Sequence, residues 1–179
     1  AIRFEGNGYG DEWKKEAKKR GLSNVTTTPP ALDAFVTKKS MDLFERNNIF
    51  SHRENEARHE IMLETYIKKI QIESRVMGSL AINHILPAAI KYQTLLVENV
   101  EGLKDIGLPK DTYAAQLELI KEISSHITII KKNVDDMIEA RKKANGITNV
   151  RTKAIAYCDK VKAHFDTLRY HVDKLELLV

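Results

Sequence analysis

Residues 51–101 read SHRENEARHEIMLETYIKKIQIESRVMGSLAINHILPAAIKYQTLLVENVE, and this stretch decides the fold. No Gly-Pro cluster or polar gap interrupts a helical pattern along it. Ser51 and Glu54 have the spacing of a capping box, which marks the start of a helix. Residues of one stripe then recur at alternating steps of three and four, as one face of a helix requires: Leu63, Ile67, Ile70, Ser74, Met77, Ala81, His84 and Ala88. The stretch predicts one long helix over about 52–101.

Pro87 lies inside this predicted helix and removes one backbone donor, so we expect a kink near residues 83–87. His84 falls on the predicted apolar stripe just before the proline. We expect it to be a structural core histidine, whose ring donates to a carbonyl freed by the kink. The alternative for His84 is a ligand or catalytic role.

Two further long helices follow. Gly102, Gly107 and Pro109 turn the chain before a helix over about 111–144, which Asn145-Gly146 ends. A third helix is expected over about 149–178. It carries a coiled-coil seam that steps by four and three, formed by Val161, Phe165, Leu168, Val172, Leu175 and Val179. Because the connections are short, the predicted fold is all-α, with residues 51–179 forming an antiparallel, coiled-coil-like bundle of three long helices.

Residues 1–50 differ from the bundle in that their helical segments are short. Asp11 is placed to cap a helix over 11–20, and Gly21 follows its basic end, where a left-handed residue is favoured. Pro30 suits the first turn of a second short helix, and another is expected around 40–47. We therefore expect a lead segment over 1–50.

Composition excludes several classes of protein. The 179 residues carry a net charge of +4, with basic and acidic side chains interleaved, so no nucleic-acid footprint is expected. No apolar run is long enough for a membrane span, and the sequence leads us to expect no signal peptide. Cys158 is the single cysteine, lies on an apolar stripe and suits a reducing compartment, so we expect a small buried side chain. The chain opens AIRFEGNGYG without Met, and we expect it to be a fragment.

Glu56 and His59 form a Glu-x-x-His unit, the spacing with which helix bundles hold two metal ions. Such a centre needs a second unit, but Glu122 and His126 are four apart, and the third helix offers only Glu176 near its end. Glu56 and His59 also precede the apolar stripe, where the helix dipole favours acidic residues. We therefore expect a charged first turn and no metal ligand.

The remaining candidates predict no catalytic or cofactor-binding residue. His126, His164 and His171 lie on separate turns without a histidine partner at metal-ligand spacing. Gly6, Gly8 and Gly10 lack the Lys-Ser/Thr of a phosphate-binding loop. No Ser-His-Asp or Cys-His arrangement can be assigned.

Residues from about 4 to 100 resemble the C-terminal region of the type III glutamine synthetases. The resemblance lies in an ordered set of short motifs: Asn7-Gly8-Tyr9, Asp11-Glu12-Trp13, Arg20-Gly21-Leu22, Thr27-Thr28-Pro29, Ala31-Leu32, Leu43-Phe44-Glu45, Arg58-His59-Glu60, Tyr66-Ile67-Lys68, Ile72-Glu73 and Ile85-Leu86-Pro87-Ala88. The sequence departs from the family at Gly10, where Ser is expected, and at His59, where Tyr is common. Residues 101–179 resemble the family only in being its closing helices.

The resemblance implies a whole enzyme that joins ammonia to glutamate, using ATP and Mg or Mn, through a γ-glutamyl phosphate. The family's catalytic residues lie upstream of residue 1, so none is carried over to this chain. By resemblance, residues 1–50 would pack on that missing catalytic core, and the partners would be neighbouring subunits of a cytoplasmic double-ring homo-oligomer. The chain alone is expected to be structural and inactive.

Two other functions are considered beside this one. One is a free-standing helical-bundle adaptor whose apolar seams recruit partner helices. The other is a di-metal oxidase, which the lone Glu-x-x-His unit disfavours.

Overall fold

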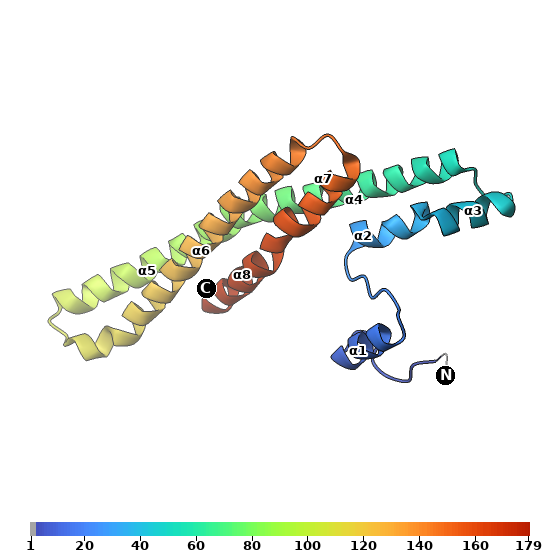
Figure 1. Cartoon of the computed structure of the whole chain (residues 1–179). Coiled ribbons are helices and arrows are strands. Elements are labelled where there is room, and N and C mark those ends of the chain that lie inside the picture. The colour runs from blue at the N-terminus through green and yellow to red at the C-terminus, as the bar shows by residue number, and fades with distance from the viewer. Residues whose placement is uncertain (1–2) are drawn as a thin grey trace. The chain divides into compact units, whose positions relative to one another are not determined.

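The computed structural model describes residues 3–179, which form helices joined by short connections (Figure 1). No strand occurs within this range, so the predicted all-α class is confirmed. The chain divides into two compact units, one ending at His59 and the other running from Glu60 to Val179.

The first unit contains short helices, as the sequence predicts. They are α1 (Asp11–Lys19), α2 (Thr28–Leu32), the 3₁₀ turn η1 (Asp33–Val36) and α3 (Lys38–Arg46). Gly21 has a φ of 70°, which confirms the left-handed residue after α1. The predicted cap is wrong by one position: Gly10 is the N-cap, and Asp11 is the first helical residue. The Asp11 carboxylate instead accepts a hydrogen bond from Lys14 Nζ at 2.8 Å.

The long helix α4 (His52–Leu80) starts at the predicted capping box. The Ser51 amide donates to Glu54 Oε2 at 2.9 Å, and the Glu54 amide donates to Ser51 Oγ at 3.3 Å. These bonds pair two backbone donors that the first turn of a helix leaves free. They also lower the pKa of the Glu54 carboxyl, with the bond from the Ser51 amide as the largest cause.

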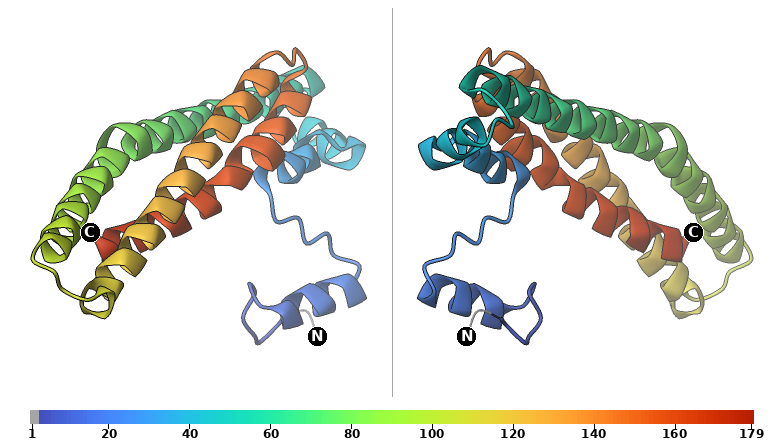
Figure 2. Two further views of the ribbon diagram at one scale, coloured as in Figure 1. Left: turned by 90° about the vertical axis from the view of Figure 1, so that its left-hand side faces the viewer. Right: turned by 90° about the vertical axis from the view of Figure 1, so that its right-hand side faces the viewer.

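The helix continues past α4 through a π-helical turn, η2 (Ala81–Ile85), into α5 (Leu86–Asp105). The amide of Leu86 donates to the carbonyl of Ala81, five residues back. A regular helix would bring the ring of Pro87 against a carbonyl four residues earlier, and the wider turn avoids that clash. The axis changes direction here, as Figure 2 shows, so the predicted kink is confirmed.

The π turn changes which side chains are buried. His84 and Ala88 are exposed, whereas Leu86 and Ala89 are buried, so the predicted core position of His84 is wrong. A π turn takes one residue more than an α turn, and every later side chain is therefore shifted by one position. The 3.6-residue period that predicted the stripe holds only up to Ala81.

The remaining elements are η3 (Lys110–Tyr113), α6 (Ala114–Asn145), α7 (Val150–Ala156), the π turn η4 (Tyr157–Val161), the 3₁₀ turn η5 (Lys162–His164) and α8 (Phe165–Leu178). The expected third helix is thus irregular in the middle. However, η4 takes an extra residue and η5 takes one fewer, so the two offset each other. Ala154, Val161, Leu168 and Leu175 are all buried, and the predicted seam keeps its phase here.

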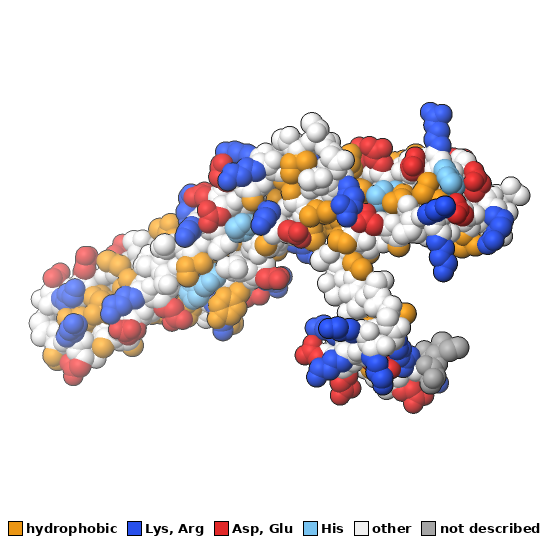
Figure 3. All heavy atoms as spheres, viewed as in Figure 1, with side chains coloured by type: hydrophobic (Ala, Val, Ile, Leu, Met, Phe, Trp, Pro, Cys, Tyr) orange, Lys and Arg blue, Asp and Glu red, His pale blue; other side chains and the backbone are white. Residues whose placement is uncertain are grey.

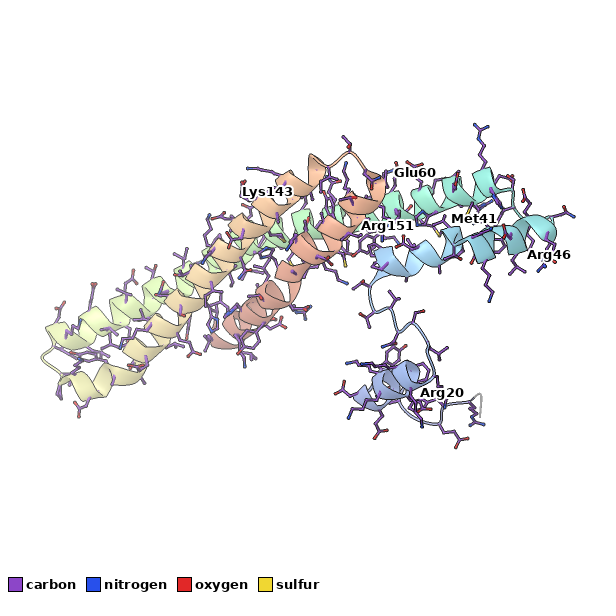
Figure 4. The ribbon with its side chains drawn as sticks, in the orientation of Figure 1. Arg20, Met41, Arg46, Glu60, Lys143 and Arg151 are labelled. Atoms are coloured by element: carbon purple, nitrogen blue, oxygen red, sulfur yellow. The ribbon has the colours of Figure 1, made fainter. Side chains whose placement is uncertain are left out.

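In the second unit, α6 is central: α5 and α8 both pack against it, and both run antiparallel to it (Figures 1 and 2). Its buried side chains recur every seven residues at Ile123, Ile130, Met137 and Ala144. This row meets the equally spaced row of α7, η4 and α8, as in an antiparallel coiled coil. Lys143 and Arg151 lie on either side of the turn that joins α6 to α7 (Figure 4).

Gly78 marks a close approach of α4 to α6. A Cβ added there would lie 3.5 Å from both Met137 Cε and Val134 Cγ1, which is ordinary van der Waals contact. We expect Gly78→Ala to raise the free energy of unfolding by about 0.5–1 kcal/mol, because Ala loses less backbone entropy in a helix. Gly78→Leu should lower it by about 1–3 kcal/mol through overpacking.

The measurement for this pair is urea unfolding followed by circular dichroism. Gly102 of α5 is the matched control, since a Cβ there meets nothing within 4 Å. Gly102→Ala and Gly102→Leu should both stabilise. If Gly78→Leu also stabilises, the close approach of α4 to α6 is incorrect.

Candidate functional site

The first candidate site, Glu56 with His59, does not form in the structure, because the two side chains lie in different environments. Glu56 is exposed, whereas His59 is half-buried and its Nε2 lies 3.5 Å from Asp33 Oδ1 of η1. His59 therefore faces a carboxylate of the short helices and not a second Glu-x-x-His unit. Between residues 3 and 179, no group of three or more His, Cys, Asp or Glu side chains is arranged to hold a metal ion.

A polar face at the start of α4 holds the segment of α2, η1 and α3 in place within the first unit. His52, Asn55 and His59 are spaced on one side of the helix. His52 Nε2 lies 3.3 Å from Glu45 Oε2, and Asn55 Nδ2 donates to the carbonyl of Phe35. Asn55 is only 1% exposed, and an amide this deeply buried requires such a partner. These contacts point to a structural role.

A second polar cluster lies in the second unit, where α6 meets α8. His126 Nδ1 and His171 Nδ1 are 2.9 Å apart, so one ring must donate and the other accept. The Nε2 atom of His126 is 4.0 Å from Glu122 Oε1, on the far side of the ring. These histidines are 45 residues apart in the sequence, and the antiparallel packing of α6 and α8 brings them together.

A matching pair lies seven residues away along each helical segment. His164 Nδ1 is 2.9 Å from Asn133 Oδ1. Slipping the two segments past one another would break both polar pairs at once, and polar side chains in an apolar seam fix a register in this way. His126, Asn133, His164 and His171 therefore align the third segment on α6.

The histidine pair predicts a dependence of stability on pH. Burial, and secondarily the neighbouring His126, lowers the pKa of His171 below its ordinary value of 6.5. The unfolded chain then binds more protons than the folded chain as the pH falls below about 6.5. Stability contributed by neutral His171 is present above that pH and is lost as the pH falls through the folded-state pKa.

We therefore expect the urea midpoint of the second unit to be lower at pH 5.5 than at pH 7.5, and His171→Gln to reduce this difference. Exposed His84 supplies the control, because His84→Gln should leave the difference unchanged. Equal pH dependence in wild type and His171→Gln would contradict the role given to this pair.

The remaining buried polar groups of the second unit include two tyrosines and a cysteine. The Tyr157 hydroxyl donates to Asn145 Oδ1 at 2.6 Å, and burial raises the pKa of Tyr157. Cys158 is buried, as the sequence predicts. Burial, and then the nearby Cys158 side chain, raises the pKa of Tyr66.

The glycine-rich segment before α1 forms a turn. The Gly10 amide donates to the Asn7 carbonyl, and the Tyr9 amide donates to Asn7 Oδ1, both at 3.0 Å. Asn7 thus uses its side chain to hold the turn. The Gly6 backbone packs against the ring of Phe4, where a Cβ would collide.

The surfaces of the helices carry basic and acidic side chains side by side, with apolar side chains exposed between them (Figure 3). Within residues 3–179, no helix combines the length and the apolar character required to cross a bilayer. Sequence reasoning missed the burial of Asn55, the hydrogen bond between Tyr157 and the Asn145 side chain, and the two polar pairs. The seven-residue spacing of His164 and His171, matched by His126 and Asn133, is the signal that could have found the pairs.

Comparison with known proteins identifies relatives along nearly the whole chain. It is 46% identical over 180 aligned residues to a glutamine synthetase of Bacteroides fragilis and 34% identical over 178 to one of Butyrivibrio fibrisolvens, covering 98% and 99% of this chain. A type-3 glutamine synthetase of Dictyostelium discoideum is 34% identical over 149 residues, or 79% of this chain. The chain spans only 19–25% of the length of these relatives.

The sequence model of the glutamine synthetase C-terminal domain matches residues 1–104, which is more than half of the chain. This range contains the motifs on which the resemblance rests, and the type-3 relative agrees with the class that they indicate. The chain belongs to the glutamine synthetase C-terminal domain family.

Proposed function

We propose that this chain is the C-terminal helical region of an enzyme that makes glutamine from glutamate, ammonia and ATP. The observation that carries the proposal is the match of residues 1–104 to the glutamine synthetase C-terminal domain. The whole enzyme would use ATP and Mg or Mn. Its catalytic residues would lie outside this chain.

The role proposed for the chain itself is to brace the catalytic core and to support subunit contacts in a double-ring homo-oligomer in the cytoplasm. The first unit supports this role, because it leaves large apolar side chains exposed at Leu22, Val25, Leu43 and Ile49. Packing on the catalytic core would remove these side chains from water, which is favourable for apolar surface. We propose that this lead segment packs on the catalytic core.

The test uses the complete protein that contains this region. It should form glutamine from glutamate and ammonia only when ATP and Mg²⁺ or Mn²⁺ are supplied, whereas the 179-residue chain assayed alone should form none. Glutamine formation by the chain alone would refute the assignment of catalysis to the missing part. A complete protein without this activity would favour the helical-bundle adaptor.

The bracing role has its own test in the complete protein. Leu43→Glu places a charge on the exposed apolar face of α3, and it should lower the melting temperature if that face is buried against the core. Leu177→Glu in α8 is the matched control, since Leu177 is also exposed. An equal response to both changes would remove the support for packing through the lead segment.

A further inference from the structure

An open apolar groove runs along the second unit between the α4–α5 helix and α8. Its two parts have volumes of about 540 and 450 Å³ and share Ile85, Val172 and Glu176 as lining residues. On the first wall it extends from Ile72 to Ala89. At a rise of 1.5 Å per residue this distance is about 25 Å, the length of a four- to five-turn helix.

Both walls present apolar side chains to the open groove. On α4 these are Ile72, Val76 and Leu80, which are 62%, 52% and 48% exposed and recur every fourth residue. On α8, Leu168 and Leu175 are buried, whereas Val172 is half-buried and Val179 is exposed. The seam of α8 therefore has two rows, one packed on α6 and one facing the groove. Apolar rows in this position are what a fourth helix of a bundle would cover.

The edge of the groove is acidic. Glu73 lies on the α4 side, and Asp173 and Glu176 lie on the α8 side. Arg169 is the basic residue among the described residues that line it, and its Nε donates to both oxygens of Asp173 at 2.7 and 2.8 Å. Because these two opposite charges offset each other, Glu73 and Glu176 give the edge its acidic character. Lys or Arg residues beside the apolar row of a docked helix would therefore strengthen its binding to the groove. A second copy seated face to face would instead bring the acidic edges together, which disfavours self-association.

We propose that an amphipathic helix with basic flanks, supplied by the part of the longer protein outside this chain, lies in this groove and completes a four-helix bundle. The inference rests on the proposed function, under which this chain is the C-terminal region of a longer enzyme. The relatives are long enough to supply such a helix, since this chain spans about a quarter of their length. The groove would then be a docking surface between the C-terminal bundle and the rest of the enzyme.

The experiment is cysteine labelling of the complete protein, with the modified position identified by mass spectrometry. Val76→Cys probes the groove, and Thr128→Cys on the exposed face of α6 is the matched control. Each rate is divided by the rate of the same variant in urea. We expect labelling at position 76 to be slowed roughly tenfold or more relative to position 128, because the docked helix must leave the groove before the cysteine can react.

A second variant tests the charge of the partner. Glu73→Lys combined with Glu176→Lys should speed labelling at position 76 severalfold, whereas Glu101→Lys on the exposed end of α5 should not. Labelling at position 76 as fast as at position 128 would overturn the proposal. So would protection that disappears on dilution, because it would show that a second copy covers the groove. Glutamine formation by the same protein tests the proposed function separately.

Discussion

Replacing Ile130 with Ala is expected to lower the free energy of unfolding of the second unit by about 3 kcal/mol. Ile130 is fully buried, with 0% of its surface exposed, in the central helix of the bundle. It lies in the row of side chains that meets the third segment, so its removal leaves a cavity that neighbouring helices cannot close without moving. The expected loss of stability has two parts: the transfer free energy of the three carbons that are removed, and the cost of the cavity that they leave.

The measurement is urea unfolding followed at 222 nm. Ile61→Ala is the matched control: it removes the same atoms from a helical side chain that is 61% exposed. We expect it to change stability by no more than about 0.5 kcal/mol. Similar losses at both positions would mean that Ile130 is not in the core of the folded protein.

Single-residue deletions should change the free energy of unfolding by different amounts in two parts of the first long helix, although the sequence of both parts has the same helical pattern. Deletion of exposed Lys69 rotates everything before it by about 100° relative to everything after it. Leu63 and Ile67 could then no longer be buried together with Ile70 and Ala81, all of which are buried in the structure. At about 1.5–3 kcal/mol for each displaced side chain, the expected loss is about 3–6 kcal/mol.

Deletion of His84 should have a much smaller effect when Pro87 is also replaced by Ala. His84 lies in the π turn, so removing it converts that turn to a regular α turn and leaves Leu86 and Ala89 facing α6. We expect this double variant to stay within about 1 kcal/mol of wild type. With Pro87 retained, the deletion should cost up to about 3 kcal/mol, because the ring would clash in a regular helix.

The two deletions are compared by urea unfolding and by the helix content of the folded state. If deleting Lys69 is tolerated as well as deleting His84 with Pro87→Ala, the burial register of α4 is incorrect. A neutral effect of the His84 deletion with Pro87 intact would show that the proline does not cause the π turn.

Much of the helical layout follows from local patterns in the sequence. The capping box at Ser51 and Glu54, the stop near Asn145-Gly146 and the left-handed Gly21 were all predictable, because each depends on residues within one or two turns. The kink before Pro87 was predictable for the same reason. The motifs from Asn7 to Ala88 also sufficed to indicate the family.

The Asp11 cap was misplaced by one position, and the error in burial occurs where a helix departs from its average period. His84 was expected in the core because a period of 3.6 residues was carried through Pro87, but the extra residue of η2 moved it to the surface. The third segment contains the same irregularity without the same error, since η5 offsets η4. Local spacing does not reveal whether a second turn will compensate for the first.

The sequence by itself determined that this protein is all-α, where most of its helices begin and end, and to which family it belongs. The helical properties depend on hydrogen bonds and side chains close together along the chain, and the family is indicated by the order of the short motifs. The tertiary structure alone decided the register of α6 against α8, in which His126 meets His171 and Asn133 meets His164. It also decided that one apolar row of α8 faces an open groove. Both follow from packing between segments that are far apart in the sequence. The free energy of that packing depends on which side chains meet across the helices, which local spacing does not specify.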